Sequence, residues 1–137
     1  MIPYQLEFDR IFRDDLARDG IFLPVTLHHG EQSVNLEAQV DTGSSCCIFR
    51  RDLGEDIGLE IESGFPQQIK TVTGSFATYG HAITVSALGF DFESVVYFAA
   101  AEDFPRNVLG RSGWLDRVRP GLIYHDSEVY LSAHEPS

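Results

Sequence analysis

The sequence predicts an all-β, mainly antiparallel domain, either a barrel or a folded sheet, that carries one or two short helices. Apolar and β-branched residues recur in short alternating runs, and turn residues separate these runs about every ten positions. No long helical pattern alternates with the strands. At 137 residues and 43% apolar content, the chain is large enough to bury one core of its own.

The first strands lead to an acidic motif. Residues 1–20 are mixed and charged, and RIFRDDLARDG within them predicts a weak helix or an irregular arm. Residues 21–27 are an apolar, strand-like run. Residues 34–40 alternate apolar and polar side chains with a period of two, which predicts a half-buried strand that ends at Asp41.

The middle of the chain predicts one helix and one hairpin. Residues 50–60 are compatible with one or two helical turns, and Gly58 suits the left-handed residue that ends a helix. β-Branched and aromatic residues flank Gly74 on both sides. This pattern predicts a hairpin with its tip near Thr73, Gly74 and Ser75.

The last third predicts further strands and turns. These segments are strands at 81–88 and 90–100, a loop at 101–107, a short strand and then a short helix in 108–119, and a closing hairpin over 121–132. The closing hairpin is expected to turn at Asp126 and Ser127, and the chain beyond residue 132 to form a loose tail.

Charge and composition exclude several classes of partner. Ten basic and 21 acidic residues give a formal charge of −11, which repels nucleic acid and which we attribute to solubility more than to a preference for basic or neutral substrates. The first residues lack the apolar segment of a secretion signal, and no apolar run approaches the ~18 residues of a membrane span. Cys46 and Cys47 are adjacent and make no disulfide framework. We therefore expect a cytoplasmic protein without nucleic-acid or membrane partners.

The motif at residues 41–44 concentrates groups that support a carboxylate. A carboxylate at the end of a buried strand must be paired, hydrogen-bonded or protonated. Gly43 lacks a Cβ, so backbone N–H groups can approach Asp41, while Thr42 can anchor the loop and Ser44 can donate to the carboxylate. A structural turn needs only part of this support.

Three stretches together resemble one family. LEAQVDTGSSCCIF, the glycine-tipped hairpin TVTGSFATYG, and NVLGRSGWLDRVRPGLIYHDSEVYL look like the retropepsin-like aspartic peptidases, single-domain relatives of pepsin that include the retroviral proteases. The resemblance runs from about residue 21 to residue 131 and is nearer to the cellular and bacterial members than to the viral ones.

The resemblance implies a closed β barrel, and it also implies how the chain is organised and assembled. A protease domain at residues 21–132 would follow an N-terminal extension, residues 1–20, and precede the tail, residues 133–137. One subunit would supply half of an active site, so a homodimer is required. The two copies of Asp41 would face each other, with each Thr42 hydroxyl reaching across to the opposite loop.

The same resemblance implies an activity, endopeptidase cleavage of a peptide or protein substrate. The paired carboxylates would share a proton and activate a water, without a cofactor or a metal. Thr73, Gly74 and Ser75 would form the substrate-binding flap. Leu109 and Gly110 would be structural, because a glycine there lets the chain cross closely behind the aspartate loop.

The chain also departs from the family. Ser45 and Cys46 stand where many viral members have an acidic partner for the arginine that corresponds to Arg111. Pro120 and Gly121 are expected to interrupt a strand.

Other functions have weaker support in the sequence. The alternative from another class is a catalytically silent module that keeps the fold and binds extended peptides or mediates assembly. GRSGW resembles a serine nucleophile turn, but Trp114 occupies the position of the required glycine two residues after Ser112. The five histidines have no tight ligand spacing, so no metal site is predicted.

Overall fold

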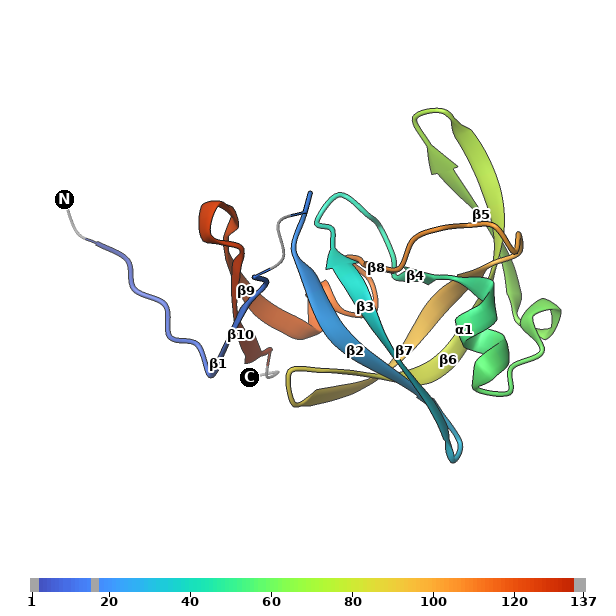
Figure 1. Cartoon of the computed structure of the whole chain (residues 1–137), viewed down its shortest axis with the longest axis horizontal. Coiled ribbons are helices and arrows are strands. Elements are labelled where there is room, and N and C mark those ends of the chain that lie inside the picture. Colours follow the sequence, from blue (N-terminus) through green and yellow to red (C-terminus); the bar gives the residue numbers. More distant parts are fainter. Residues whose placement is uncertain (1–2, 16–17, 135–137) are drawn as a thin grey trace.

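The computed structural model describes residues 3–15 and 18–134, and in these residues the strands form two sheets. The larger sheet contains β2 (Phe22–His29), β3 (Gln32–Val40), β4 (Ile48–Phe49), β5 (Phe65–Thr71), β6 (Gly74–Ala87), β7 (Phe90–Ala99) and β8 (Val108–Leu109). The smaller sheet contains β1 (Arg10–Arg13), β9 (Val118–Ile123) and β10 (Glu128–Ala133). The helices are α1 (Arg51–Asp56) and the 3-10 turns η1 (Ile61–Ser63), η2 (Leu115–Arg117) and η3 (Tyr124–Asp126). The predicted all-β, mainly antiparallel fold is confirmed (Figure 1).

The larger sheet folds back on itself. Its strand order is β2-β3-β8-β4-β7-β6-β5, and β2 pairs in addition with β6. Most neighbouring strands are antiparallel, but β3 pairs in parallel with β8, and β4 pairs in parallel with β7. The β3–β8 pairing places two segments that are distant in sequence side by side at the end of β3.

The core lies inside this curved sheet. Leu23, Val25 and Leu27 alternate along β2 and are at most 2% exposed, as the period-two pattern of a half-buried strand requires. Phe98 of β7 and Trp114 are fully buried against them in the same cluster. The strands β3 and β8 are therefore anchored in the core just before the loops that follow them.

The predicted helix and its end are confirmed. α1 is followed by Gly58 with φ +84°, the left-handed conformation that glycine adopts most easily. The Gly58 N–H donates to the Glu55 carbonyl and the Leu59 N–H donates to the Gly54 carbonyl, which is the Schellman arrangement.

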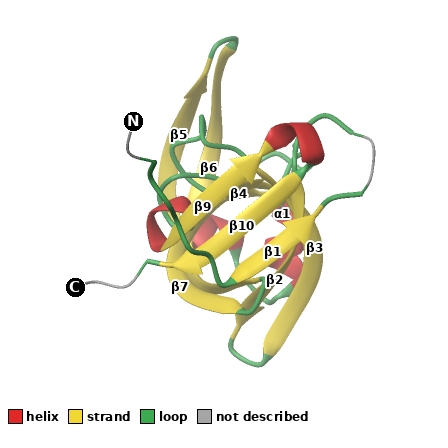
Figure 2. Ribbon diagram, turned by 90° about the vertical axis from the view of Figure 1, so that its left-hand side faces the viewer, coloured by secondary structure: helices red, strands yellow, loops and turns green. Residues whose placement is uncertain are grey.

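The smaller sheet shows that the prediction for the start of the chain was wrong. Residues 10–13 form β1, a strand paired with β10, where the sequence favoured a weak helix or an irregular arm (Figure 2). Arg13 forms a salt bridge with the buried carboxylate of Glu128. The two residues are 115 positions apart in the sequence. Because β1 is stabilised by a segment near the other end of the chain, residues 10–13 carry no local sequence pattern that would predict a strand.

Pro120 and Gly121 do not interrupt a strand, so that expectation was also wrong. Both lie inside β9, where they pair with Leu131 and Tyr130 of β10. In the order β1-β10-β9, β9 is an edge strand of the smaller sheet, and an edge strand tolerates a proline that cannot donate a hydrogen bond.

The closing hairpin turns where the sequence predicted, through η3 and Ser127, which has φ +52°. The division of the chain into residues 1–20, 21–132 and 133–137 stays a prediction, and residues 135–137 lie outside the described part. Within the residues that the structure describes, no helix is long and apolar enough to cross a membrane.

Candidate active site

Asp41 follows β3 directly and is held by the neighbouring strand β8. Val40 pairs in parallel with Leu109, and the Asp41 N–H donates to the Leu109 carbonyl at 3.0 Å. Leu109 is itself fully buried. The backbone of Asp41 is therefore fixed by the core, while its side chain remains 35% exposed.

The loop after Asp41 supports the carboxylate through Gly43, as the sequence suggested, but the described residues do not make the contacts expected of Ser44 and Thr42. The Gly43 N–H donates to Asp41 Oδ1 at 2.9 Å, and a Cβ on Gly43 would lie only 3.2 Å from that oxygen. The Ser44 hydroxyl donates to the Cys46 carbonyl at 2.8 Å instead of to Asp41, so the predicted Ser44 contact is wrong. Thr42 is exposed, and its hydroxyl has no hydrogen-bond partner among the described residues.

The segment after β8 crosses directly behind this loop. The Arg111 N–H donates to the Ser44 carbonyl and the Ser112 N–H to the Ser45 carbonyl, both at 2.9 Å. A Cβ on Gly110 would lie 2.1 Å from the Cys46 carbonyl oxygen. Only glycine permits this approach, which is the close crossing that the sequence predicted for Gly110.

The two cysteines are packing residues in this structure. Both thiols are free and both residues are buried. Burial raises the pKa of the Cys47 thiol to about 12 and also raises the pKa of Cys46. Neither thiol is activated as a nucleophile, since a reactive cysteine needs a lowered pKa.

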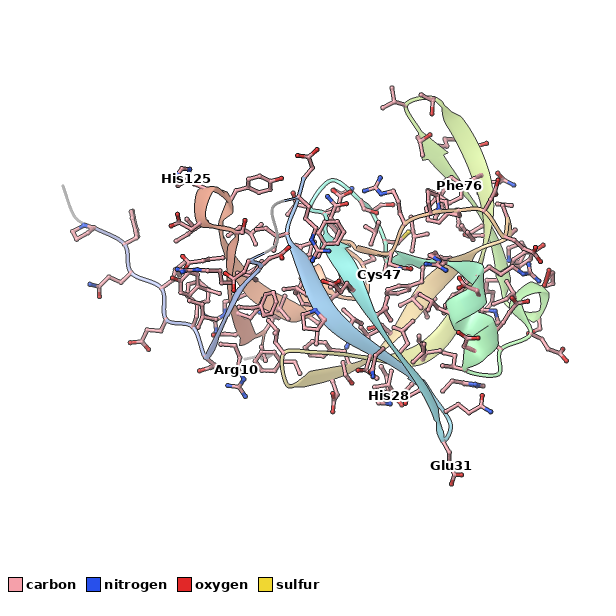
Figure 3. All side chains as sticks on the ribbon, viewed as in Figure 1. Arg10, His28, Glu31, Cys47, Phe76 and His125 are labelled. Atoms are coloured by element: carbon pink, nitrogen blue, oxygen red, sulfur yellow. The ribbon has the colours of Figure 1, made fainter. Side chains whose placement is uncertain are left out.

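The Asp41 carboxylate lies in a cleft of about 560 Å³ between its own loop and the hairpin of β5 and β6. Phe76, which Figure 3 labels on the hairpin, stacks on Phe104 of the loop before β8, with 4.9 Å between ring centroids. Both side chains form part of the wall of the cleft. The lining residues are Asp41, Gly43, Ser44, Ser45, Ile48, Ile69, Lys70, Thr71, Val72, Phe76, Phe104, Arg106, Val108 and Arg111.

Two arginines approach Asp41 and its loop. Arg106 Nη2 lies 3.8 Å from Asp41 Oδ2 and donates to Gln39 Oε1 at 2.9 Å. Arg111 Nε donates to the Ser44 carbonyl at 3.4 Å and forms no ion pair with a carboxylate in the described residues. In place of the acidic partner that the corresponding arginine has in many viral members, the Arg111 guanidinium group therefore contacts a backbone carbonyl.

The predicted hairpin residues lie at its tip and are not among the residues that line the cleft. Thr71 pairs with Gly74, so the two-residue turn is Val72 and Thr73, and Gly74 and Ser75 begin β6. None of Thr73, Gly74 and Ser75 lines the cleft, whereas Thr71 and Val72 do. The hairpin is confirmed, and the substrate-binding role of its tip stays a prediction.

Sequence reasoning missed the side chains that shape the cleft from outside the motif, Lys70, Phe76, Phe104 and Arg106. Arg106 was treated only as part of a loop, although it lies three residues before Leu109, whose position beside Asp41 could have drawn attention to it. Among the described residues, no group of three His, Cys, Asp or Glu side chains is arranged to hold a metal ion.

Comparisons with known proteins agree with this geometry. A family model described as aspartyl protease matches residues 23–112. A retropepsin-like aspartic protease from Rickettsia conorii has a similar structure, with a TM-score of 0.66, 19% identity, and coverage of 90% of this chain and 97% of that one. The EIAV protease, in complex with the inhibitor HBY-793, has a TM-score of 0.55, 19% identity, and coverage of 73% and 88%. A search of curated proteins gave no significant match.

Proposed function

The chain belongs to the aspartyl protease family and has the retropepsin-like fold, and from this premise we propose that it is an aspartic endopeptidase active as a homodimer. The observation that carries the proposal is the Asp41 carboxylate, held by β8 and the Gly43 N–H at the cleft between its loop and the β5–β6 hairpin. In this proposal Asp41 of each subunit is catalytic.

A second copy is needed because the mechanism requires two carboxylates. Of the described residues that line the cleft, Asp41 is the single acidic one. A twofold axis beside the cleft would bring Asp41 of another copy opposite the first and complete the pair.

The edge of the smaller sheet offers a surface for this second copy. β9 is an edge strand, and Leu122, Ile123 and the adjoining Tyr124 are 39%, 43% and 64% exposed. Figure 1 places the turn between β9 and β10, the loop after β3 and the tip of the β5–β6 hairpin along one side of the molecule, uppermost in that view. Pairing of two β9 edges would cover the apolar side chains and keep both Asp41 loops at the interface.

The proposed chemistry follows from the repulsion between the two carboxylates. Like charges about 3 Å apart cannot both ionise cheaply, so the pair holds one proton between them. The ionised carboxylate takes a proton from water as the water oxygen bonds to the scissile carbonyl carbon, and the protonated one donates to the carbonyl oxygen. The C–N bond then breaks as the C=O bond re-forms: the amine nitrogen receives the proton taken from water, and the hydroxyl that becomes the C=O group gives its proton to the ionised carboxylate, which restores the pair.

The β5–β6 hairpin acts as the flap in this proposal. Val72 at its turn is fully exposed, so its side chain does not pack against the rest of the described residues, whereas Phe76 further along the hairpin is anchored on Phe104. An extended peptide would lie beneath it as an added strand, and closure would exclude water and align the scissile bond.

The proposal is tested with Asp41→Asn, which keeps the size of the side chain and removes its charge. The wild-type protein should cleave a denatured protein at mildly acidic pH, and the variant should be slower by at least ~10²-fold with an unchanged circular dichroism spectrum. Equal cleavage by both would place the active site elsewhere. Peptide binding without cleavage by either would favour the catalytically silent module.

A further inference from the structure

The cleft has a charge opposite to that of the rest of the protein. The chain carries ten basic residues against 21 acidic ones. Three of the basic residues, Lys70, Arg106 and Arg111, line the cleft, and Asp41 is the one carboxylate among its described lining residues. The local excess of positive charge suggests a ligand that supplies negative charge.

Both arginines retain donors for such a ligand. A guanidinium group has five N–H donors, and the contacts described for Arg106 are one hydrogen bond to Gln39 and the 3.8 Å approach to Asp41. Arg111 donates to the Ser44 carbonyl through Nε, which positions the group, and its terminal nitrogens have no hydrogen-bond partner among the residues that the structure describes. A carboxylate can take two parallel N–H donors from either arginine.

The proposed dimer increases the charge imbalance. Its carboxylate pair would hold one proton and so carry about one negative charge, while the two subunits contribute two copies of Arg106 and two of Arg111. Asp41 attracts Arg106 only weakly, because the two side chains are partly exposed and lie 3.8 Å apart. This attraction cannot neutralise the positive charge of the arginines.

We propose that the preferred substrate is a peptide with an Asp or Glu side chain within about two residues of the scissile bond, bound by Arg106 with Arg111 beside it. The position follows from distance: a carboxylate in contact with Arg106 lies about 3 Å beyond it, hence about 7 Å from Asp41, and an extended peptide advances about 3.3 Å per residue. This inference rests on the proposed endopeptidase function. It runs against the preference for basic or neutral substrates that the overall charge alone would suggest.

The test begins with a peptide library cleaved by the wild-type protein and read by mass spectrometry, which should show enrichment of Asp and Glu within two residues of the cleaved bonds. A preferred peptide is then made in three forms, with Glu, Gln or Lys at the enriched position. The Glu form should have a kcat/KM about ten-fold or more above the Gln form, with the Lys form lowest.

Variants assign the preference to Arg106. Arg106→Gln should remove most of the difference between the Glu and Gln peptides, and Arg106→Glu should reverse the order of the Glu and Lys peptides. Arg10→Gln is the matched control, because it changes the net charge equally but lies on the side of the molecule away from the β5–β6 hairpin (Figure 3). It should leave the preference unchanged.

Two results would overturn the inference: equal kcat/KM for the Glu and Gln peptides with the wild-type protein, or an equal loss of preference in Arg10→Gln and Arg106→Gln. A failure of the proposed function is distinguished by binding. If no peptide is cleaved, three forms of one library peptide are made with Glu, Gln or Lys at the same central position, and fluorescence anisotropy with Asp41→Asn compares their affinities. Tighter binding of the Glu form would then support the charge preference without the activity, and equal binding would refute it.

Discussion

Replacing Gly110 with alanine tests the close crossing behind the aspartate loop. The new Cβ would lie 2.1 Å from the Cys46 carbonyl oxygen and 2.9 Å from that of Ser44, whereas ordinary contact begins at 3.4 Å. Backbone atoms must therefore separate by more than about 1 Å. Gly110 does not have a positive φ, so the penalty is steric and does not come from its own backbone conformation.

The expected cost can be estimated from what must move. Forced overpacking costs about 1–3 kcal/mol. Separation of the two segments also weakens the hydrogen bonds from Arg111 to Ser44 and from Ser112 to Ser45, each worth about 0.5–1.5 kcal/mol. Gly110→Ala should therefore lower the free energy of unfolding by about 4 kcal/mol.

The assay is equilibrium urea unfolding with Gly30→Ala as the control. Gly30 has φ +60° but nothing within 4 Å of an added Cβ, so its alanine variant should lose only the ~1–2 kcal/mol of a left-handed residue. A loss in Gly110→Ala no larger than that in Gly30→Ala would refute the steric account of the crossing.

Two further predictions concern the buried thiol and the proposed interface. The Cys47 thiol has a pKa of about 12 when folded against 9.0 in its ordinary state, so the stability it contributes is complete below pH 9 and is lost as the pH rises toward 12. The difference in unfolding free energy between wild type and Cys47→Ala should shrink over that range, and a constant difference would contradict the burial argument. Ile123→Lys should raise the dimer dissociation constant in sedimentation about ten-fold or more, because it places a charge in the apolar interface. Val95→Lys, at an equally exposed position in β7, should not, and equal effects would exclude the β9 edge.

The parts of the fold that could be predicted were those with local signals. The alternation in residues 34–40 reflects the face of β3 that is turned toward the core. Asp41 at its end is recognisable from sequence because a carboxylate is unusual at the end of an apolar strand. Gly58 could be interpreted because it answers a local steric requirement at the end of α1. Gly110 approaches the backbone of Cys46, which is distant in sequence, and its role was inferred through the family resemblance. The alternation placed Asp41 at the end of a strand, as the structure has it after β3, whereas the pairing of β3 with β8 was not predicted.

The parts that could not be predicted depend on contacts between distant segments. β1 exists because β10, at the other end of the chain, supplies its hydrogen bonds. The cleft walls come from Phe76 and Phe104, which approach only after the sheet has folded back on itself. Arg106 is an ordinary loop residue in the sequence, and its distance from Asp41 appears only in three dimensions.

The central claim, that two copies of Asp41 form one catalytic pair, is tested most directly by subunit mixing. Wild-type and Asp41→Asn proteins are unfolded together, refolded in known ratios and assayed at constant total concentration, with Arg10→Gln in place of Asp41→Asn as the control. If each active site needs both carboxylates, activity follows the square of the wild-type fraction and falls to about one quarter at equal amounts. A linear fall, to about one half, would mean that each chain acts alone and would contradict the account.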